Sequence, residues 1–289
     1  MTRTITTCPG IGDTIWLLMK LINQKEKFHW KVGDGSPQRS KPLFDLFPQL
    51  TESFEYIPNS GYKQIKRDAS RGLWKQMPDK FSLEANSHLE AGFRIEDFLP
   101  DLETSFILPY QTDNYFRQAD NFIKKPTYIS QGKYIGIYTT SYSNSRYMSG
   151  WLLDEWSRFI QLLRVHNPEY KFVFIGAEYD LGLSDELMKL FPKEIYINAM
   201  NQSLGVTIEI LKRLEMFVGF QSGLSIINET IGAKQTVMLY SPKLAAMIET
   251  WPDKKRIESG AYKGATFGTA KHPLKPEQLF DWLIEFKKI

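Results

Sequence analysis

Apolar and polar residues alternate with the spacing of strands and helices in two regions of the chain. In the first region, residues 3–7 read as a strand, residues 13–23 as an amphipathic helix and residues 28–32 as a second strand. Prolines then interrupt residues 33–71, where the pattern predicts only short pieces. The second region begins at Lys133, after a predicted helix at 114–124, and its strands and helices alternate. The strands are at 134–138, 171–175, 195–197, 216–219 and 236–240, and the helices are at 151–165, 184–190, 205–214, from 222 and at 276–288.

Strands that alternate with helices at this spacing predict parallel sheets, and therefore an α/β protein with two Rossmann-like domains. We expect an N-terminal domain over residues 1–125 and a C-terminal domain over 126–289, linked within 111–131. The final helix is a candidate to cross back to the first domain. Two such domains place the ligand in the cleft between the carboxyl ends of their sheets.

Composition excludes several classes of protein. The 289 residues are 42% hydrophobic and 14% aromatic, which is typical of folded cores, and the net charge of +3 is far from that of a histone-like polycation. A single cysteine and four scattered histidines exclude a disulfide framework and offer no close metal-ligand spacing. Because no apolar run approaches the ~18 residues of a membrane span and Lys20 interrupts the run after Asp13, we expect a soluble, cytoplasmic protein.

The first candidate site is the turn Gly10-Ile11-Gly12-Asp13, which follows the first strand. Glycines allow the backbone to approach a ligand closely, and a carboxylate beside them can face the cleft as a general base. The same residues also fit a tight turn in which Asp13, or Thr14, caps the following helix.

Two further polar loops follow predicted strands of the second region. Residues 139–146 carry five hydroxyl groups and Arg146, a set that suits phosphate oxygens, although a solvated polar loop has the same composition. Gln221, Ser222 and Gly223 precede a helix, whose first N–H groups can bind a diphosphate or can simply be capped by Ser222.

Taken in this order, the three motifs resemble those of the glycosyltransferase family 9 heptosyltransferases, which have the GT-B architecture. The counterparts of the family motifs are Gly10-Ile11-Gly12-Asp13, Thr139-Thr140 with Arg146, Val218-Gly219-Phe220-Gln221-Ser222-Gly223 and Thr236-Val237-Met238-Leu239-Tyr240-Ser241-Pro242. The resemblance is good over the first twenty residues and over 133–242, and poor over 33–125.

The resemblance implies an inverting hexosyl- or heptosyltransferase of bacterial or phage type that takes its sugar from a nucleotide diphosphate. It implies Asp13 as the catalytic base and a donor site made by Gly12, Thr139, Thr140, Arg146, Gln221, Ser222 and Gly223. Gln221 replaces the usual Asp or Asn and Ser225 replaces a frequent His, so the resemblance does not identify the sugar. No Asp-x-Asp triplet occurs in the chain, and we expect neither a metal nor another cofactor.

The first domain carries two candidate acceptor segments. His88, Glu90, Arg94 and Glu96 could bind acceptor hydroxyls, or could supply an alternative base if Asp13 only caps its helix. A capped surface helix with a Glu90–Arg94 pair is the simpler explanation of the same residues. Residues 62–80 are basic and include Lys66 and Arg67. This composition suits an anionic glycan or DNA with a modified base, and a solvated helix face explains it more simply. The expected acceptor is therefore a lipopolysaccharide-like glycan, with DNA as the alternative.

Two other functions compete with a glycosyltransferase. Gln221 and Ser225 would also fit a degenerate GT-B protein that binds a nucleotide or glycan without turnover. A nicotinamide-dependent oxidoreductase is disfavoured, because the first turn lacks the Gly-x-Gly-x-x-Gly pattern.

Overall fold

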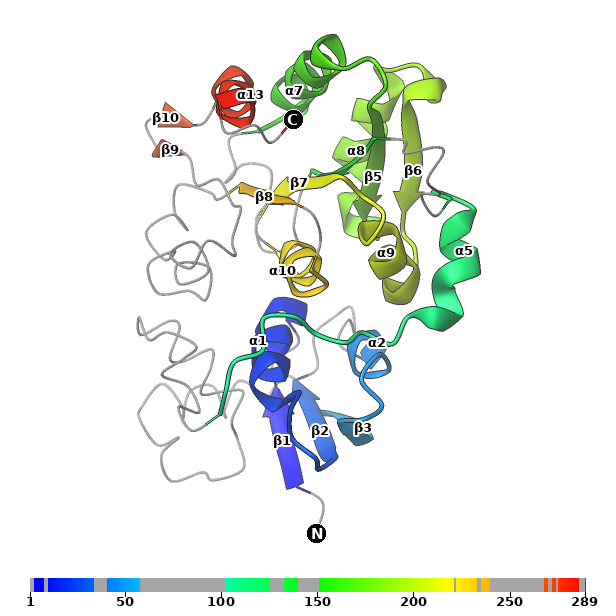
Figure 1. Cartoon of the computed structure of the whole chain (residues 1–289), viewed down its shortest axis with the longest axis vertical. Helices are drawn as coiled ribbons and strands as arrows, with labels where there is room; N and C mark the ends of the chain where they lie inside the picture. Colours follow the sequence, from blue (N-terminus) through cyan, green and yellow to red (C-terminus); the bar gives the residue numbers. More distant parts are fainter. Residues whose placement is uncertain are drawn as a thin grey trace. The chain divides into compact units, whose positions relative to one another are not determined.

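The computed structural model describes residues 3–7, 10–33, 41–57, 102–124, 133–139, 151–220, 222–232, 235–239, 268–269, 272–273, 275–285 and 289. They form two compact units: the described residues up to Gln111 belong to unit 1, and those from Thr112 onward belong to unit 2 (Figure 1). This division precedes the predicted boundary at 125/126, because residues 112–124 fold onto unit 2.

Unit 1 contains a parallel sheet in the order β1-β2-β3. Its strands are β1 (Arg3–Thr7), β2 (Phe28–Gly33) and β3 (Thr51–Ile57), and its helices are α1 (Ile11–Leu21) and α2 (Lys41–Phe44). The two predicted strands of this region are confirmed. Both β3 and α2 lie in the proline-rich stretch, where the pattern predicts short pieces without fixing their bounds.

The core of unit 1 follows from the alternation within its strands. Ile5, Trp30 and Val32 are fully buried on one face of the sheet, and the Trp30 ring lies 4.5 Å from the ring of Phe44. Because successive side chains of a strand point to opposite faces, this spacing places one apolar face of the sheet against α2.

Unit 2 contains a five-stranded parallel sheet in the order β6-β5-β4-β7-β8. The strands are β4 (Tyr134–Tyr138), β5 (Lys171–Gly176), β6 (Tyr196–Met200), β7 (Met216–Phe220) and β8 (Thr236–Leu239). The chain runs outward from β4 to β6 and then returns to add β7 on the other side of β4. The strand order therefore reverses between β4 and β7, which is the topological switch point of a Rossmann-type sheet.

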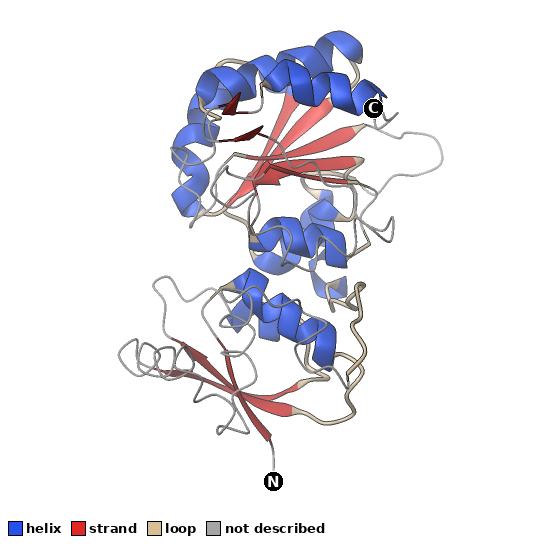
Figure 2. Cartoon of the chain, turned by 90° about the vertical axis from the view of Figure 1, so that its left-hand side faces the viewer, coloured by secondary structure: helices blue, strands red, loops and turns tan. Residues whose placement is uncertain are grey.

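Helices lie on both faces of the unit 2 sheet, as Figure 2 shows. They are α7 (Leu153–His166), α8 (Leu181–Lys189), α9 (Leu204–Leu211), α10 (Gly223–Thr230) and α13 (Pro276–Glu285). Shorter elements are η2 (Asp113–Tyr115), α5 (Phe116–Asp120), η3 (Glu178–Asp180), η4 (Lys193–Ile195) and the antiparallel pair β9 (Gly268–Thr269) and β10 (His272–Pro273).

Helix α13 packs within unit 2. Its Leu279 and Leu283 are fully buried in the same cluster as Trp156 and Phe159 of α7, and Arg158 of α7 donates a hydrogen bond to Glu277 of α13 at 2.6 Å. The apolar side of this helix, the candidate to cross back to the first domain, thus completes the core of unit 2.

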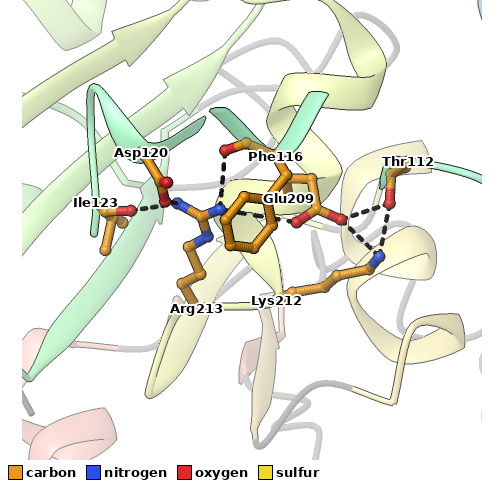
Figure 3. Close-up of polar contacts among 7 residues, drawn as sticks. All are labelled: Thr112, Phe116, Asp120, Ile123, Glu209, Lys212 and Arg213. Atoms are coloured by element: carbon orange, nitrogen blue, oxygen red, sulfur yellow. Dashed lines mark hydrogen bonds and ion pairs between the residues drawn. The ribbon is translucent and has the colours of Figure 1, made fainter. Parts of the chain in front are cut away.

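A charged network fixes the start of unit 2 to α9 (Figure 3). The Glu209 carboxylate, which is nearly buried, accepts hydrogen bonds from the Thr112 hydroxyl at 2.5 Å and from the Lys212 ammonium group at 2.7 Å. Arg213 donates to the Asp120 carboxylate and to the Phe116 carbonyl oxygen. These contacts explain why residues 112–124, part of the predicted link, belong to unit 2.

Candidate functional site

The carboxyl edge of the unit 2 sheet brings three predicted donor residues together. Strands β4 and β7 are parallel neighbours, with Tyr138 opposite Gly219 in the register. Thr139 immediately follows β4, and Ser222 and Gly223 follow β7. Because both strands end at the same edge and flank the switch point, these residues lie where open α/β sheets bind their ligands.

Thr139 is fully buried at the end of β4. Its hydroxyl forms a 2.9 Å hydrogen bond with the hydroxyl of Ser184 on α8, and Ser184 is also fully buried. The side chain predicted to contact a donor is thus paired inside the protein in this structure.

The turn between β7 and α10 forms a regular helix start. Ser222 is the N-cap residue with extended backbone, and its hydroxyl oxygen accepts from the N–H of Ser225 at 3.4 Å. Ser225 is buried and donates its own hydroxyl to the Phe220 carbonyl oxygen at 2.6 Å. Ser222 and Gly223 are half-exposed. Ser222 therefore caps this helix, as the capping alternative expects. The N–H groups before Ser225 in the first turn have no acceptor within the helix, so the helix start can still bind an anion.

A third loop at this edge was not singled out by the sequence motifs. Strand β5 neighbours β4 and is followed by η3, in which Glu178 is exposed and Asp180 is buried. The Asp180 carboxylate accepts a hydrogen bond from the Ala177 N–H at 2.9 Å. The sequence signal for this loop is Glu178, an acidic residue that follows β5, the second strand of a Rossmann-type unit.

In unit 1, helix α1 begins at Ile11 with Gly10 as its N-cap, so Gly12 and Asp13 lie in its first turn. The expected start at residue 13, with Asp13 or Thr14 as the cap, is wrong. The Thr14 hydroxyl instead donates to the Gly10 carbonyl oxygen at 2.9 Å and lies 3.2 Å from the Thr7 hydroxyl. The backbone position of Asp13 is defined, while its side chain lies outside the described part of the structure.

The remaining candidate residues lie outside the described residues, and their roles stay predictions. On the donor side these are Thr140, Arg146 and Gln221, and on the acceptor side they are Lys66, Arg67, His88, Glu90 and Arg94.

The pKa values of groups on β3, on α13 and before β5 are shifted by identifiable contacts. The hydrogen bond from Lys31 lowers the pKa of Glu55 on β3, and the hydrogen bond from Arg158 lowers the pKa of Glu277 on α13. Burial raises the pKa of Tyr170, before β5. Among the described residues, no group of three or more His, Cys, Asp and Glu side chains could hold a metal ion. No helix in the described ranges is long and apolar enough to span a membrane.

Sequence comparison matches neither a protein-family model nor a curated protein. The fold, in contrast, is similar to solved structures over nearly the whole chain. A glycosyltransferase family 9 protein from Veillonella parvula has a TM-score of 0.61 at 15% identity, with 99% of this chain and 97% of that chain covered.

Two further similar structures contain nucleotide sugars. The E. coli heptosyltransferase WaaC with ADP-2-deoxy-2-fluoro heptose has a TM-score of 0.56 at 15% identity, and the match covers 99% of this chain and 100% of that chain. A UDP-GlcNAc 2-epimerase from Neisseria meningitidis bound to UDP-GlcNAc has a TM-score of 0.50 at 9% identity, covering 99% and 92% of the two chains.

At these identities the comparisons establish the fold. The resemblance to glycosyltransferase family 9 is confirmed at this level, together with the α/β class and its two units built on parallel sheets.

Proposed function

We propose that this protein is a glycosyltransferase that moves a sugar from a nucleotide diphosphate sugar to an acceptor hydroxyl, with inversion at the anomeric carbon. The observation that carries the proposal is the fold likeness to family 9 structures over nearly the full length of both chains. The order of the Gly12-Asp13, Thr139-Thr140 and Ser222-Gly223 motifs favours a transferase over the epimerase that shares this fold.

The proposed donor site is the carboxyl edge of the unit 2 sheet. The first N–H groups of α10, near Ser222 and Gly223, would bind the diphosphate, because the positive end of a helix attracts anions. Gly12, Thr140, Arg146 and Gln221 complete the proposed donor contacts. The exposed Glu178 would accept hydrogen bonds from the ribose hydroxyls, by analogy with the acidic residue that binds ribose in dinucleotide-binding Rossmann sheets.

The proposed reaction is a single displacement. Asp13 takes the proton of the acceptor hydroxyl as the acceptor oxygen attacks the anomeric carbon from the face opposite the diphosphate. The bond between that carbon and the phosphate oxygen breaks, and its electron pair leaves with the nucleoside diphosphate. Arg146 and the N–H groups of α10 would stabilise the charge that develops on the leaving group.

We propose that this reaction needs no metal ion. The helix N-terminus and Arg146 can supply the electrostatic stabilisation that a divalent cation provides in other transferases. Activity that EDTA abolishes and Mn²⁺ restores would contradict this part of the proposal.

The proposed acceptor is a lipopolysaccharide-like glycan, and the reaction is placed in the cytoplasm with its soluble donor. The basic segment with Lys66 and Arg67 keeps a DNA base as the alternative acceptor. DNA binding that weakens with added salt and with charge reversal of Lys66 and Arg67 would favour DNA as the acceptor, because phosphate contacts release counterions. Absence of DNA binding at low salt would exclude it.

The test is incubation of the purified protein with ADP-, UDP- and GDP-linked sugars, followed by NMR of the sugar and detection of free nucleoside diphosphate. We expect slow hydrolysis of one donor without acceptor, with an inverted product. Recovery of an intact nucleotide sugar with a changed sugar stereocentre would indicate an epimerase. Binding without cleavage, even with glycan acceptors, would indicate a degenerate binding protein.

A further inference from the structure

Three buried polar side chains connect the ends of β4 and β5 to the beginning of α8. They are Thr139 and Ser184, which are fully buried, and Asp180, which is 1% exposed. We call this set the edge brace. It lies beneath the same sheet edge at which the loops after β4, β5 and β7 begin.

The first contact of the edge brace joins β4 to α8. The hydroxyl groups of Thr139 and Ser184 are 2.9 Å apart, and neither side chain has exposed surface. A ligand outside the protein could reach the Thr139 hydroxyl only if this pair separated. Breaking the pair would leave a buried hydroxyl without its partner, which is unfavourable.

The second contact joins β5 to α8. The Asp180 carboxylate accepts from the Ala177 N–H at 2.9 Å, and the Asp180 N–H donates to the Ala177 carbonyl oxygen at 2.9 Å. A side chain at Gly176 would meet this carboxylate, since an added Cβ would lie 2.9 Å from Oδ2. The turn is therefore closed from both sides, with the exposed Glu178 within it.

We propose that the edge brace is a positioning device for the nucleotide site, and that Thr139 acts through Ser184 rather than by touching the donor. The nature of the ligand rests on the proposed function. The brace itself rests on the two contacts, which hold the ends of adjacent strands against one helix and so preorganise that edge of the sheet.

A double-mutant cycle tests this inference. The variants are Thr139→Val, Ser184→Ala and their combination, and the measurement is the Kd of ADP and UDP by calorimetry. Each single variant should weaken binding about three- to tenfold, the range that one lost hydrogen bond supports. The double variant should bind no more weakly than either single variant, because both remove the same interaction. Thr139→Ser keeps a hydroxyl and should retain the wild-type Kd.

A matched control removes a buried hydrogen bond of unit 2 that involves none of the loops after β4, β5 and β7. The fully buried Thr112 hydroxyl donates to the Glu209 carboxylate of α9 at 2.5 Å. Thr112→Val should lower the unfolding temperature, yet leave the Kd within about twofold of wild type.

Two outcomes would overturn the inference. If Ser184→Ala binds like wild type while Thr139→Val does not, Thr139 contacts the nucleotide directly. If both variants fold and bind like wild type, the brace positions nothing. If wild-type protein binds no nucleotide, the proposed function fails, and amide hydrogen exchange tests the edge brace separately. The Ala177 amide should exchange faster in Asp180→Ala than in wild type. An unchanged exchange rate would disprove the edge brace.

Discussion

Arg213 donates a hydrogen bond from its guanidinium to the Asp120 carboxylate at 2.7 Å, and its side chain is only 3% exposed. The same guanidinium donates to the carbonyl oxygens of Phe116 and Ile123 and lies 4.7 Å from the Phe116 ring centre. A buried guanidinium has lost its water, so these partners must replace the lost hydrogen bonds. The contacts tie the first helix of unit 2 to the turn after α9.

Removal of this guanidinium should strongly destabilise unit 2. Arg213→Ala removes the buried guanidinium that pairs with the Asp120 and Glu209 carboxylates and should cost about 3–5 kcal/mol of unfolding free energy, measured by urea denaturation. Arg158→Ala is the matched control, because Arg158 and its partner Glu277 form an exposed ion pair. That variant should cost less than about 1 kcal/mol. Equal costs for the two variants would refute the structural role given to Arg213.

Two glycines of unit 2 should respond in opposite ways to replacement by alanine. A Cβ at Gly219 on β7 would lie 2.8 Å from the Tyr138 Cβ on β4, whereas a Cβ at Gly182 on α8 would meet nothing within 4 Å. Gly219→Ala should therefore cost about 1–3 kcal/mol through overpacking. Gly182→Ala should stabilise by about 0.5–1 kcal/mol, because alanine favours the helix. Thermal unfolding of both variants checks the signs, and a stable Gly219→Ala variant would contradict the close approach of β4 and β7.

Local pattern predicts unit 2 better than unit 1 for a physical reason. Residues 172–176 are all buried, so a run of apolar residues marks β5 directly. Strand β3, in contrast, carries Glu52, Ser53 and Glu55 among its apolar positions and lies between prolines. The start of α1 was misplaced because its cap, Gly10, has no side chain for a polar-cap rule to detect.

The candidate site depends on strand order, which local pattern does not contain. Thr139, Glu178 and Ser222 are far apart in the sequence and share one edge only because β5 and β7 flank β4. The motif loops were predictable from their polar residues after apolar strands. The pairing of Thr139 with Ser184 was not, because both residues are ordinary hydroxyls until tertiary packing buries them together.

The ion pair between α7 and α13 should make stability depend on pH in acid. The Arg158 hydrogen bond lowers the pKa of Glu277 in the folded state. Its contribution is therefore fully present above the unfolded-state pKa and is lost as the pH falls through the folded-state pKa. Glu277→Gln should be less stable than wild type near neutral pH and equal to it in strong acid. A difference in stability that is the same at both pH values would contradict this assignment.

Glu178 should distinguish ribose from deoxyribose if it binds the nucleotide. Wild-type protein should bind ADP or UDP more tightly than the 2′-deoxy or 3′-deoxy forms, and Glu178→Ala should lose about tenfold in affinity for the ribonucleotide, the effect of losing a charge-assisted hydrogen bond. Its control is Glu186→Ala, which removes another exposed carboxylate, on α8. An unchanged preference for ribose in Glu178→Ala would exclude this contact.

Asp13→Asn should separate catalysis from donor binding. Asparagine preserves the size of the side chain in the first turn of α1 but cannot accept the acceptor proton, so kcat should fall by about 10²–10⁴-fold. The Kd of the nucleotide should stay within about twofold, because the proposed diphosphate contacts lie mainly in unit 2. Asp45→Asn, at an exposed carboxylate paired with Lys41 in unit 1, controls for the loss of charge and should keep the wild-type rate. A near wild-type kcat in Asp13→Asn would remove Asp13 as the base, and Glu90 would then be the next carboxylate to replace.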